Sequence, residues 1–125
     1  MVHKRLLCPQ RRRRTPEQFS WVDHRLVRER RLEPCSAQAW ALYLFLVTVG
    51  DAQGLSYYSD ASLTARLPLD HDRLAHARDE LIGADLIAFE PPLYQVLSLD
   101  RGDTSARGSG PRSFAEVLRQ MRAQP

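Results

Sequence analysis

The chain has 125 residues, 43% of them hydrophobic, and a formal net charge of +3. This length predicts one domain with tails, and no apolar run reaches the roughly 18 residues of a membrane span. The basic start is followed by too short an apolar stretch for a signal peptide, so we expect a cytoplasmic protein. Cys8 and Cys35 stand alone in the sequence, which excludes a zinc knuckle and a disulfide framework and predicts reduced thiols.

Charge is distributed unevenly along the chain. Residues 1–33 hold ten lysines and arginines against four acidic residues, and residues 34–100 hold three against nine. Residues 101–125 hold five against two. Such a separation of charge indicates that an extension of the chain, and not the folded body, meets a polyanion.

Residues 1–18 have the composition of a flexible basic arm. Arg11 to Arg14 form an uninterrupted run, with few apolar residues nearby to bury. Blocks of like charge repel and stay disordered until they meet a partner. In the next segment, residues 19–33, a short helix near 23–31 and an extended start at 19–22 are equally compatible with the pattern. Pro34 closes that segment, because the residue before a proline avoids the helical region.

The stretch from Ser36 to Val49 is predicted to be the central helix of the domain. It is apolar on nearly every face, which is typical of a helix packed on several sides. Ser36 is the expected N-cap, and Gly50 is expected to end the helix with a positive φ. The aromatic residues that we assign to the core, with one ring of the tyrosine pair exposed, are Trp40, Tyr43, Phe45, Tyr57 and Tyr58.

Short elements follow the central helix in a regular order. We expect a turn at 51–54, a strand at 55–58 and a helix at 61–67, which Ser59 or Asp60 would cap. Pro68 and Leu69 break that helix, and Asp70 caps an amphipathic helix that ends near 83–85. Two strands, 86–89 and 93–99, are joined by a stiff connection rich in proline.

The last part of the chain is predicted to be a linker and a short helix. Residues 101–112 are rich in glycine, serine and arginine. Residues 113–125 carry apolar side chains at 114, 117, 118 and 121, the spacing of one helical face. This stripe either folds back on the body or docks on a partner.

The fold class is therefore mainly α with a small β-hairpin, an α+β arrangement. Residues 37–99 resemble a winged helix-turn-helix domain, most closely those of bacterial and phage replication-initiation and mobile-element proteins and of MarR-like or GntR-like regulators. The residues that carry the resemblance are Ser59, Leu63, Leu67, Leu69, Asp70, Leu74, Ala77, Glu80, Leu81, Ala84, Asp85, Leu86, Ile87, Tyr94, Gln95 and Val96. With its extensions, the chain would be such a domain at 19–100, preceded by the basic arm.

The resemblance implies that a helix near 61–66 places the helix near 71–82 in the major groove of DNA, with the hairpin as the wing. Its candidates for base contacts are His71, Asp72, Arg73, Ala75, His76 and Asp79. The sequence departs from the pattern at Pro68 and at Asp85, both positions where glycine is usual. It also departs in charge, because the helix is acidic and the wing tip has no basic residue.

The residues that we predict to bind DNA are Arg11, Arg12, Arg13, Arg14, Arg25, Arg28, Arg30, Arg31, His71, Arg73 and His76. Each group has a plainer interpretation. The arginine run could be a generic basic tail, and the four arginines at 25–31 a solvated face paired with neighbouring carboxylates. His71 and Arg73 could be surface residues of a helix that binds protein instead.

Nothing in the sequence points to catalysis. There is no nucleophile motif, no phosphate-binding glycine loop and no histidine or cysteine spacing that suits a metal. We therefore expect a non-enzyme without a cofactor or metal.

Two functions remain open at this stage. The first is a DNA-binding accessory or regulatory protein for replication, transposition or transcription control of a mobile element, binding double-stranded DNA mainly through its arginine-rich segment. The alternative is a winged-helix protein-interaction module whose acidic body docks a basic partner such as a recombinase or replication protein. Residues 19–33 and 113–122 are candidate surfaces for a homodimer.

Overall fold

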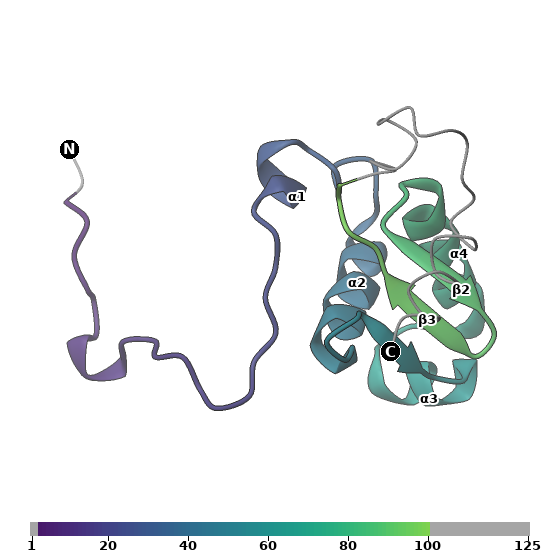
Figure 1. Ribbon diagram of the computed structural model, residues 1–125, viewed down its shortest axis with the longest axis horizontal. Coiled ribbons are helices and arrows are strands. Elements are labelled where there is room, and N and C mark those ends of the chain that lie inside the picture. The colour runs from purple at the N-terminus through teal and green to yellow at the C-terminus, as the bar shows by residue number, and fades with distance from the viewer. Residues whose placement is uncertain (1–2, 101–125) are drawn as a thin grey trace, which may run out of the picture.

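The computed structural model describes residues 3–100 (Figure 1). The described part is an α+β fold in which helices pack against one small antiparallel sheet. In chain order, the elements are η1 (Pro9–Arg11), α1 (Arg25–Arg28), α2 (Ala37–Val49), β1 (Leu55–Tyr57), α3 (Asp60–Arg66), α4 (His71–Gly83), β2 (Ile87–Glu90) and β3 (Leu93–Val96). The predicted linker and the predicted helix at 113–125 lie outside the described residues.

The core forms where α2 packs against α4 and the sheet. Ala39, Leu42 and Leu46 on α2 are fully buried, as are Leu74 and Leu81 on α4. These residues recur at helical spacing, so each helix turns one apolar stripe inward. The buried stripe of α4 confirms the amphipathic pattern expected from the sequence.

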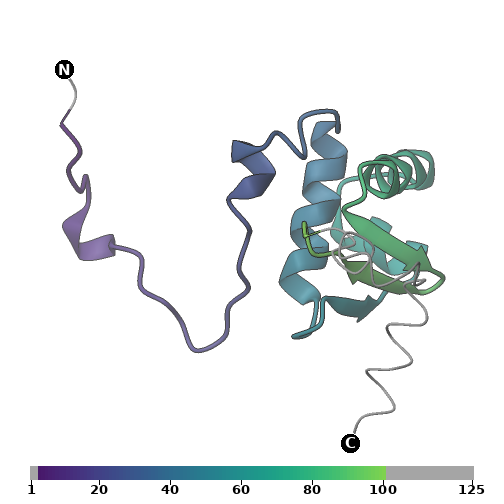
Figure 2. The ribbon, with the colours of Figure 1, turned by 45° about the horizontal axis from the view of Figure 1, so that its top comes forward.

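The described residues leave one face of α2 open, so the helix packs on several sides, as expected, but not on all of them. Leu44 is 59% exposed and Trp40 is 40% exposed. Among the helices and strands of residues 3–100, the one beside this face is α1, a helix of four residues (Figure 2). The Trp40 indole donates a hydrogen bond to the Leu32 carbonyl at 3.1 Å, but its ring is not core.

The helix starts are capped as the sequence predicts. The side chains of Ser36, Ser59 and Asp70 each accept a hydrogen bond from the backbone N–H three residues on, in α2, α3 and α4. These bonds satisfy donors that the first helical turn leaves without a partner.

The end of α2 differs from the expectation. Gly50 has a φ of −66°, so a positive φ is not the reason for glycine there. A Cβ at this position would lie 3.0 Å from the Leu46 carbonyl oxygen and 3.3 Å from the carbonyl carbon of Gly54. Glycine suits this position because two backbone segments approach closely, and they would have to move apart by a few tenths of an ångström to admit a side chain. The positive φ, +83°, occurs at Gly54 in the following turn.

The sheet has the strand order β1-β3-β2, with both pairs antiparallel. The last strand is shorter than predicted, because after Val96 the Leu97 N–H turns to the Leu86 carbonyl at 3.0 Å. Asp85 has a φ of 64°, which confirms that an aspartate occupies the left-handed position before β2. Tyr57 is 71% exposed, which confirms that one ring of the tyrosine pair lies outside the core. Its neighbour Tyr58 packs edge-on against Phe45.

Residues 3–24 run away from the body as a mostly extended segment (Figures 1 and 2). Within residues 3–18, every side chain is exposed, and the one regular element is η1. The Ser20 hydroxyl donates to the Thr48 carbonyl at 3.3 Å, where the segment meets the end of α2.

Candidate nucleic-acid interface

The pair α3 and α4 presents the start of α4 to solvent. Leu63 on α3 and Leu74 on α4 are fully buried, and Leu69 in the connection is buried too. These contacts fix the angle between the helices, while His71 and Arg73 in the first turn of α4 stay exposed. The sequence therefore placed these two side chains correctly on the surface.

The outermost line of α4 is acidic. Asp72, His76, Asp79 and Gly83 follow the spacing i, i+4, i+7 and i+11, opposite the buried stripe, and all four are exposed. The helix geometry places the carboxylates of Asp72 and Asp79 on the same solvent-facing line, the part of α4 farthest from the core. We call these four residues the acidic ridge.

The flanks of α4 hold loose, solvent-exposed contacts. The Arg73 Nε lies 4.0 Å from an Asp70 carboxylate oxygen, and the Arg73 side chain is two-thirds exposed. The His76 Nδ1 lies 3.4 Å from a Glu80 carboxylate oxygen. Exposed pairs of this kind contribute little stability, so Arg73 and His76 are free to turn towards another molecule.

Glu80, near the C-terminal end of α4, connects this helix to the start of α2. Its carboxylate accepts a hydrogen bond from the Ser36 backbone N–H at 2.7 Å, which holds the start of α2. That hydrogen bond lowers the pKa of Glu80. Glu80 is therefore part of the fold and not of the candidate interface.

Arg78 is also structural. Its guanidinium donates to Asp60 and to the Tyr94 hydroxyl, each at 2.9 Å, and it lies 4.4 Å from the centre of the Phe89 ring. Burial works against the charge of Arg78, but the hydrogen bonds to Asp60 and Tyr94 outweigh it and raise the pKa. This arginine joins α3, α4 and the sheet, so it is not available to a phosphate.

The β2–β3 hairpin brings no positive charge to the surface. Its tip is Glu90, Pro91 and Pro92, all exposed, and residues 87–96 contain no lysine or arginine. A wing that neutralised phosphates would need such residues. The hairpin can therefore add shape to an interface but not electrostatic attraction.

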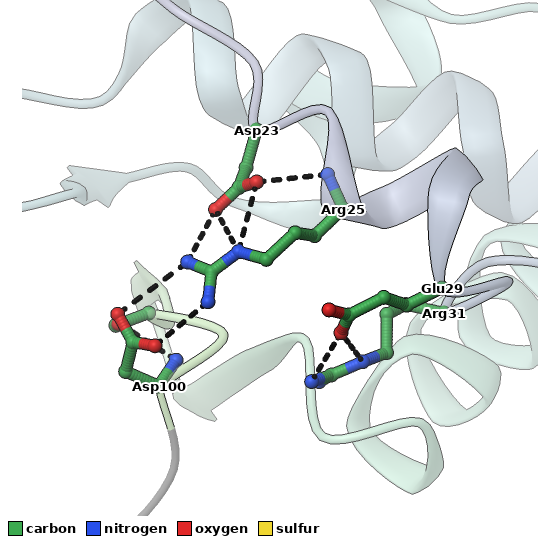
Figure 3. A network of polar contacts seen from close by, with 6 residues as sticks. Asp23, Arg25, Glu29, Arg31 and Asp100 are labelled. Atoms are coloured by element: carbon green, nitrogen blue, oxygen red, sulfur yellow. Dashed lines mark hydrogen bonds and ion pairs between the residues drawn. The ribbon is translucent and has the colours of Figure 1, made fainter.

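Three of the four arginines at 25–31 are already paired with carboxylates. Figure 3 shows Arg25 between Asp23 and Asp100, with a nitrogen–oxygen distance of 2.7 Å to each. Hydrogen bonds from Arg25 hold the pKa of Asp23 at about 2. Arg31 pairs with Glu29 at 3.0 Å and Arg30 with Glu33 at 3.6 Å. Within the described part of the chain, no ion pair involves Arg28.

The arginines near α1 do not share a surface with the start of α4. In both views α2 lies between α1 and α4 (Figures 1 and 2). Arg11 to Arg14 are exposed on the separate N-terminal segment. The structure thus divides the predicted DNA-binding residues among three places: the N-terminal segment, the region of α1 and the first turns of α4.

Arg66 is an exposed basic residue that is not among the residues predicted to bind DNA. It is exposed in the last turn of α3, just before the connection to α4, and it forms no ion pair within residues 3–100. Its position at the end of the first helix of the pair was a signal that could have found it. Among the arginines outside α4, it is the one closest in sequence to the start of that helix.

Other kinds of site find no support in the described residues. In this part of the chain, no group of three or more histidine, cysteine, aspartate or glutamate side chains could hold a metal ion. No described helix has the length and apolar character to cross a membrane. Cys8 and Cys35 are free thiols. Comparisons with protein-family models, with curated proteins and with solved structures find no match for the chain.

Proposed function

We propose that this chain is a winged helix-turn-helix protein that binds double-stranded DNA in an accessory or regulatory role. The observation that carries the proposal is the order of its elements, α2–β1–α3–α4–β2–β3, with a β1-β3-β2 sheet and an α3–α4 pair that exposes the first turn of α4. In the helix-turn-helix class, the second helix of such a pair enters the major groove with its N-terminal residues towards the bases. Replication, transposition and transcription control of a mobile element are all compatible processes.

In this proposal, α4 supplies sequence preference and little affinity. Arg73 can donate two hydrogen bonds to guanine, and the carboxylate of Asp72 can accept one from the amino group of cytosine. The same carboxylate repels phosphates. A helix of this composition discriminates between bases only when another part of the protein holds the duplex.

Affinity then comes from the basic N-terminal segment. Arg11 to Arg14 are exposed and form no ion pair with the body, so each can neutralise a phosphate. Basic arms beside helix-turn-helix domains reach the minor groove in this way. Arg28 and Arg66 can add contacts without breaking an ion pair.

The experiment that tests the proposal is selection of binding sites from a random duplex library, followed by affinity measurements on a selected site and on its scrambled version. The His71→Ala/Arg73→Ala double variant is expected to lower the ratio of the two affinities about tenfold or more, because a good bidentate base contact is worth about 1–3 kcal/mol. Arg28→Ala is the control, an exposed arginine away from α4. Failure of the wild-type chain to enrich any sequence would contradict sequence-specific binding.

The acidic ridge favours a second candidate function, a protein-interaction module. Asp72 and Asp79 would pair with a basic surface of a recombinase or a replication protein, and α4 would not enter DNA. The Asp72→Asn/Asp79→Asn variant separates the two functions. Under the first, affinity for a mixed-sequence duplex rises because repulsion is removed; under the second, duplex affinity is unchanged and a basic partner is lost.

A further inference from the structure

An apolar groove runs between residues 22–32 and the uncovered face of α2. Its volume is about 650 Å³, and the side chains that define it include Val22, Leu26, Val27, Trp40, Leu44 and Val47. Val27 is 69% exposed and Leu44 is 59% exposed, so the groove opens to solvent. Apolar surface gathered in this way marks a place where another element binds.

The walls of the groove suit an amphipathic helix. Residues 37–49, which form α2, contain no charged side chain, and the wall from α1 contributes Leu26 and Val27. A helix that lies in such a groove buries one stripe of apolar residues and leaves its polar face in water. The occupant should therefore carry apolar side chains at i, i+3, i+4 and i+7.

The chain itself carries a segment with this pattern. Phe114, Val117, Leu118 and Met121 follow the required spacing, with Glu116 and Arg119 on the opposite face. The segment lies outside the described residues. It is the part of residues 101–125 with an apolar stripe, because residues 101–112 are mainly glycine, serine and charged residues.

The place where the described chain ends favours docking within one molecule. Leu99 is buried, and Asp100 is held by Arg25 of α1 at 2.7 Å (Figure 3). Asp100 and Arg25 line a second pocket, which adjoins the groove because Asp23, Tyr43 and Val47 line both. The 12 residues from 101 to 112 can span up to about 40 Å. The 13 residues of α2 span about 20 Å, so the linker reaches every part of the groove.

We propose that the groove between α1 and α2 is the docking site for the chain's own segment 113–122. A tether of this length gives the segment an effective concentration in the millimolar range. The same segment from a second copy of the chain, at micromolar concentration, therefore competes poorly with the tethered segment for the groove. The docked segment would cover Leu44 and Val27 and complete the packing that α2 lacks on this side.

The test is a nuclear magnetic resonance comparison of full-length chains. In the wild-type chain, we expect nuclear Overhauser contacts between the Phe114 ring and the methyl groups of Leu44 or Val27. Leu118→Glu should abolish them and shift the signal of the Trp40 indole N–H, whose ring lines the groove. Gln120→Glu, which adds the same charge off the apolar stripe, should leave both unchanged.

A second pair of variants tests the groove itself. Leu44→Glu should release the segment, whereas Ile82→Glu should not, because Ile82 is a similarly exposed apolar residue on α4, outside the groove. Both replace exposed side chains, so both are expected to fold. The proposal is overturned if the wild-type chain shows no contact from Phe114 to the groove. It is also overturned if those contacts appear only as the chain dimerises with rising concentration in sedimentation velocity.

Discussion

The N-terminal segment, residues 3–24, and the body, residues 25–100, differ in how far their apolar side chains are buried. In the body, leucines at helical spacing are buried almost completely; in residues 3–24, Leu7 is 81% and Trp21 76% exposed. The segment carries four consecutive arginines, which repel one another and have no core to join. Burial of apolar side chains therefore decides which part of the chain forms a packed core. The part without a core keeps its charged side chains exposed to solvent.

The largest expected difference between the two regions is in stability. Leu42→Ala in the body should lower the free energy of unfolding by about 2–5 kcal/mol, because a fully buried side chain leaves a cavity. Leu7→Ala in the segment should change it by less than about 0.5 kcal/mol. Urea denaturation followed by circular dichroism measures both. Similar losses for the two variants would show that the segment packs on the body.

The arginines give a sharper version of the same comparison. Arg78→Gln should cost about 1–3 kcal/mol of stability, because Asp60 and Tyr94 lose a charged hydrogen-bond donor. Arg66→Gln, at an exposed arginine on the preceding helix, should cost less than about 0.5 kcal/mol. The same denaturation experiment applies. An equal effect of the two changes would mean that the contacts of Arg78 contribute nothing in solution.

A helix cap should matter less than either core contact. Asp70→Ala removes the acceptor of the Arg73 backbone N–H, at 2.8 Å, and should cost about 1 kcal/mol. Asp79→Ala, an exposed carboxylate in the middle of α4, is the matched control and should be close to neutral. A neutral Asp70→Ala variant would show that the start of α4 does not depend on its cap.

The smallest expected effect concerns pH and the junction between the two regions. Asp23 has a pKa of about 2 in the folded protein against an ordinary 3.8, because it accepts hydrogen bonds from Arg25. Since the folded pKa is lowered, the contribution is complete above pH 3.8 and is lost as the pH falls through about 2. The Arg25 backbone N–H, bonded to Asp23 at 2.8 Å, should then exchange with solvent faster.

Hydrogen exchange measured between pH 5 and 1, corrected for intrinsic rates, checks this. The amides of α2 should stay protected over the range in which Arg25 loses protection. In Arg25→Gln, which keeps the backbone N–H but removes the guanidinium, the step for this amide should move to higher pH, towards the ordinary pKa of 3.8. A step of the same size at Leu42 would place the acid-sensitive contact in the core instead.

The sequence predicted those features of the fold that are set by residues close together in the chain. The caps at Ser36 and Asp70 and the left-handed Asp85 depend on two to four residues each and were placed correctly, and Ser59 was one of the two caps expected for α3. The uncovered face of α2 could not be foreseen, because an apolar helix has the same sequence whether or not a neighbour covers it.

The candidate site shows the same limit. That His71 and Arg73 are exposed follows from the helical pattern. The contact between Arg25 and Asp100 joins residues that lie 75 positions apart in the sequence. No local sequence pattern predicts such a contact. The separation of α1 from α4 by α2 likewise depends on the packing of the whole domain.

We propose that the N-terminal segment, and not the body, attracts DNA. The direct measurement is affinity for a mixed-sequence duplex over a series of salt concentrations, with Arg11 to Arg14 replaced by glutamine in one variant and by lysine in another. The glutamine variant should bind more weakly, and its dependence on salt should be shallower by about 0.9 logarithmic units per lost phosphate contact. The lysine variant should keep the slope of the wild type. A glutamine variant with the affinity and the slope of the wild type would contradict the account.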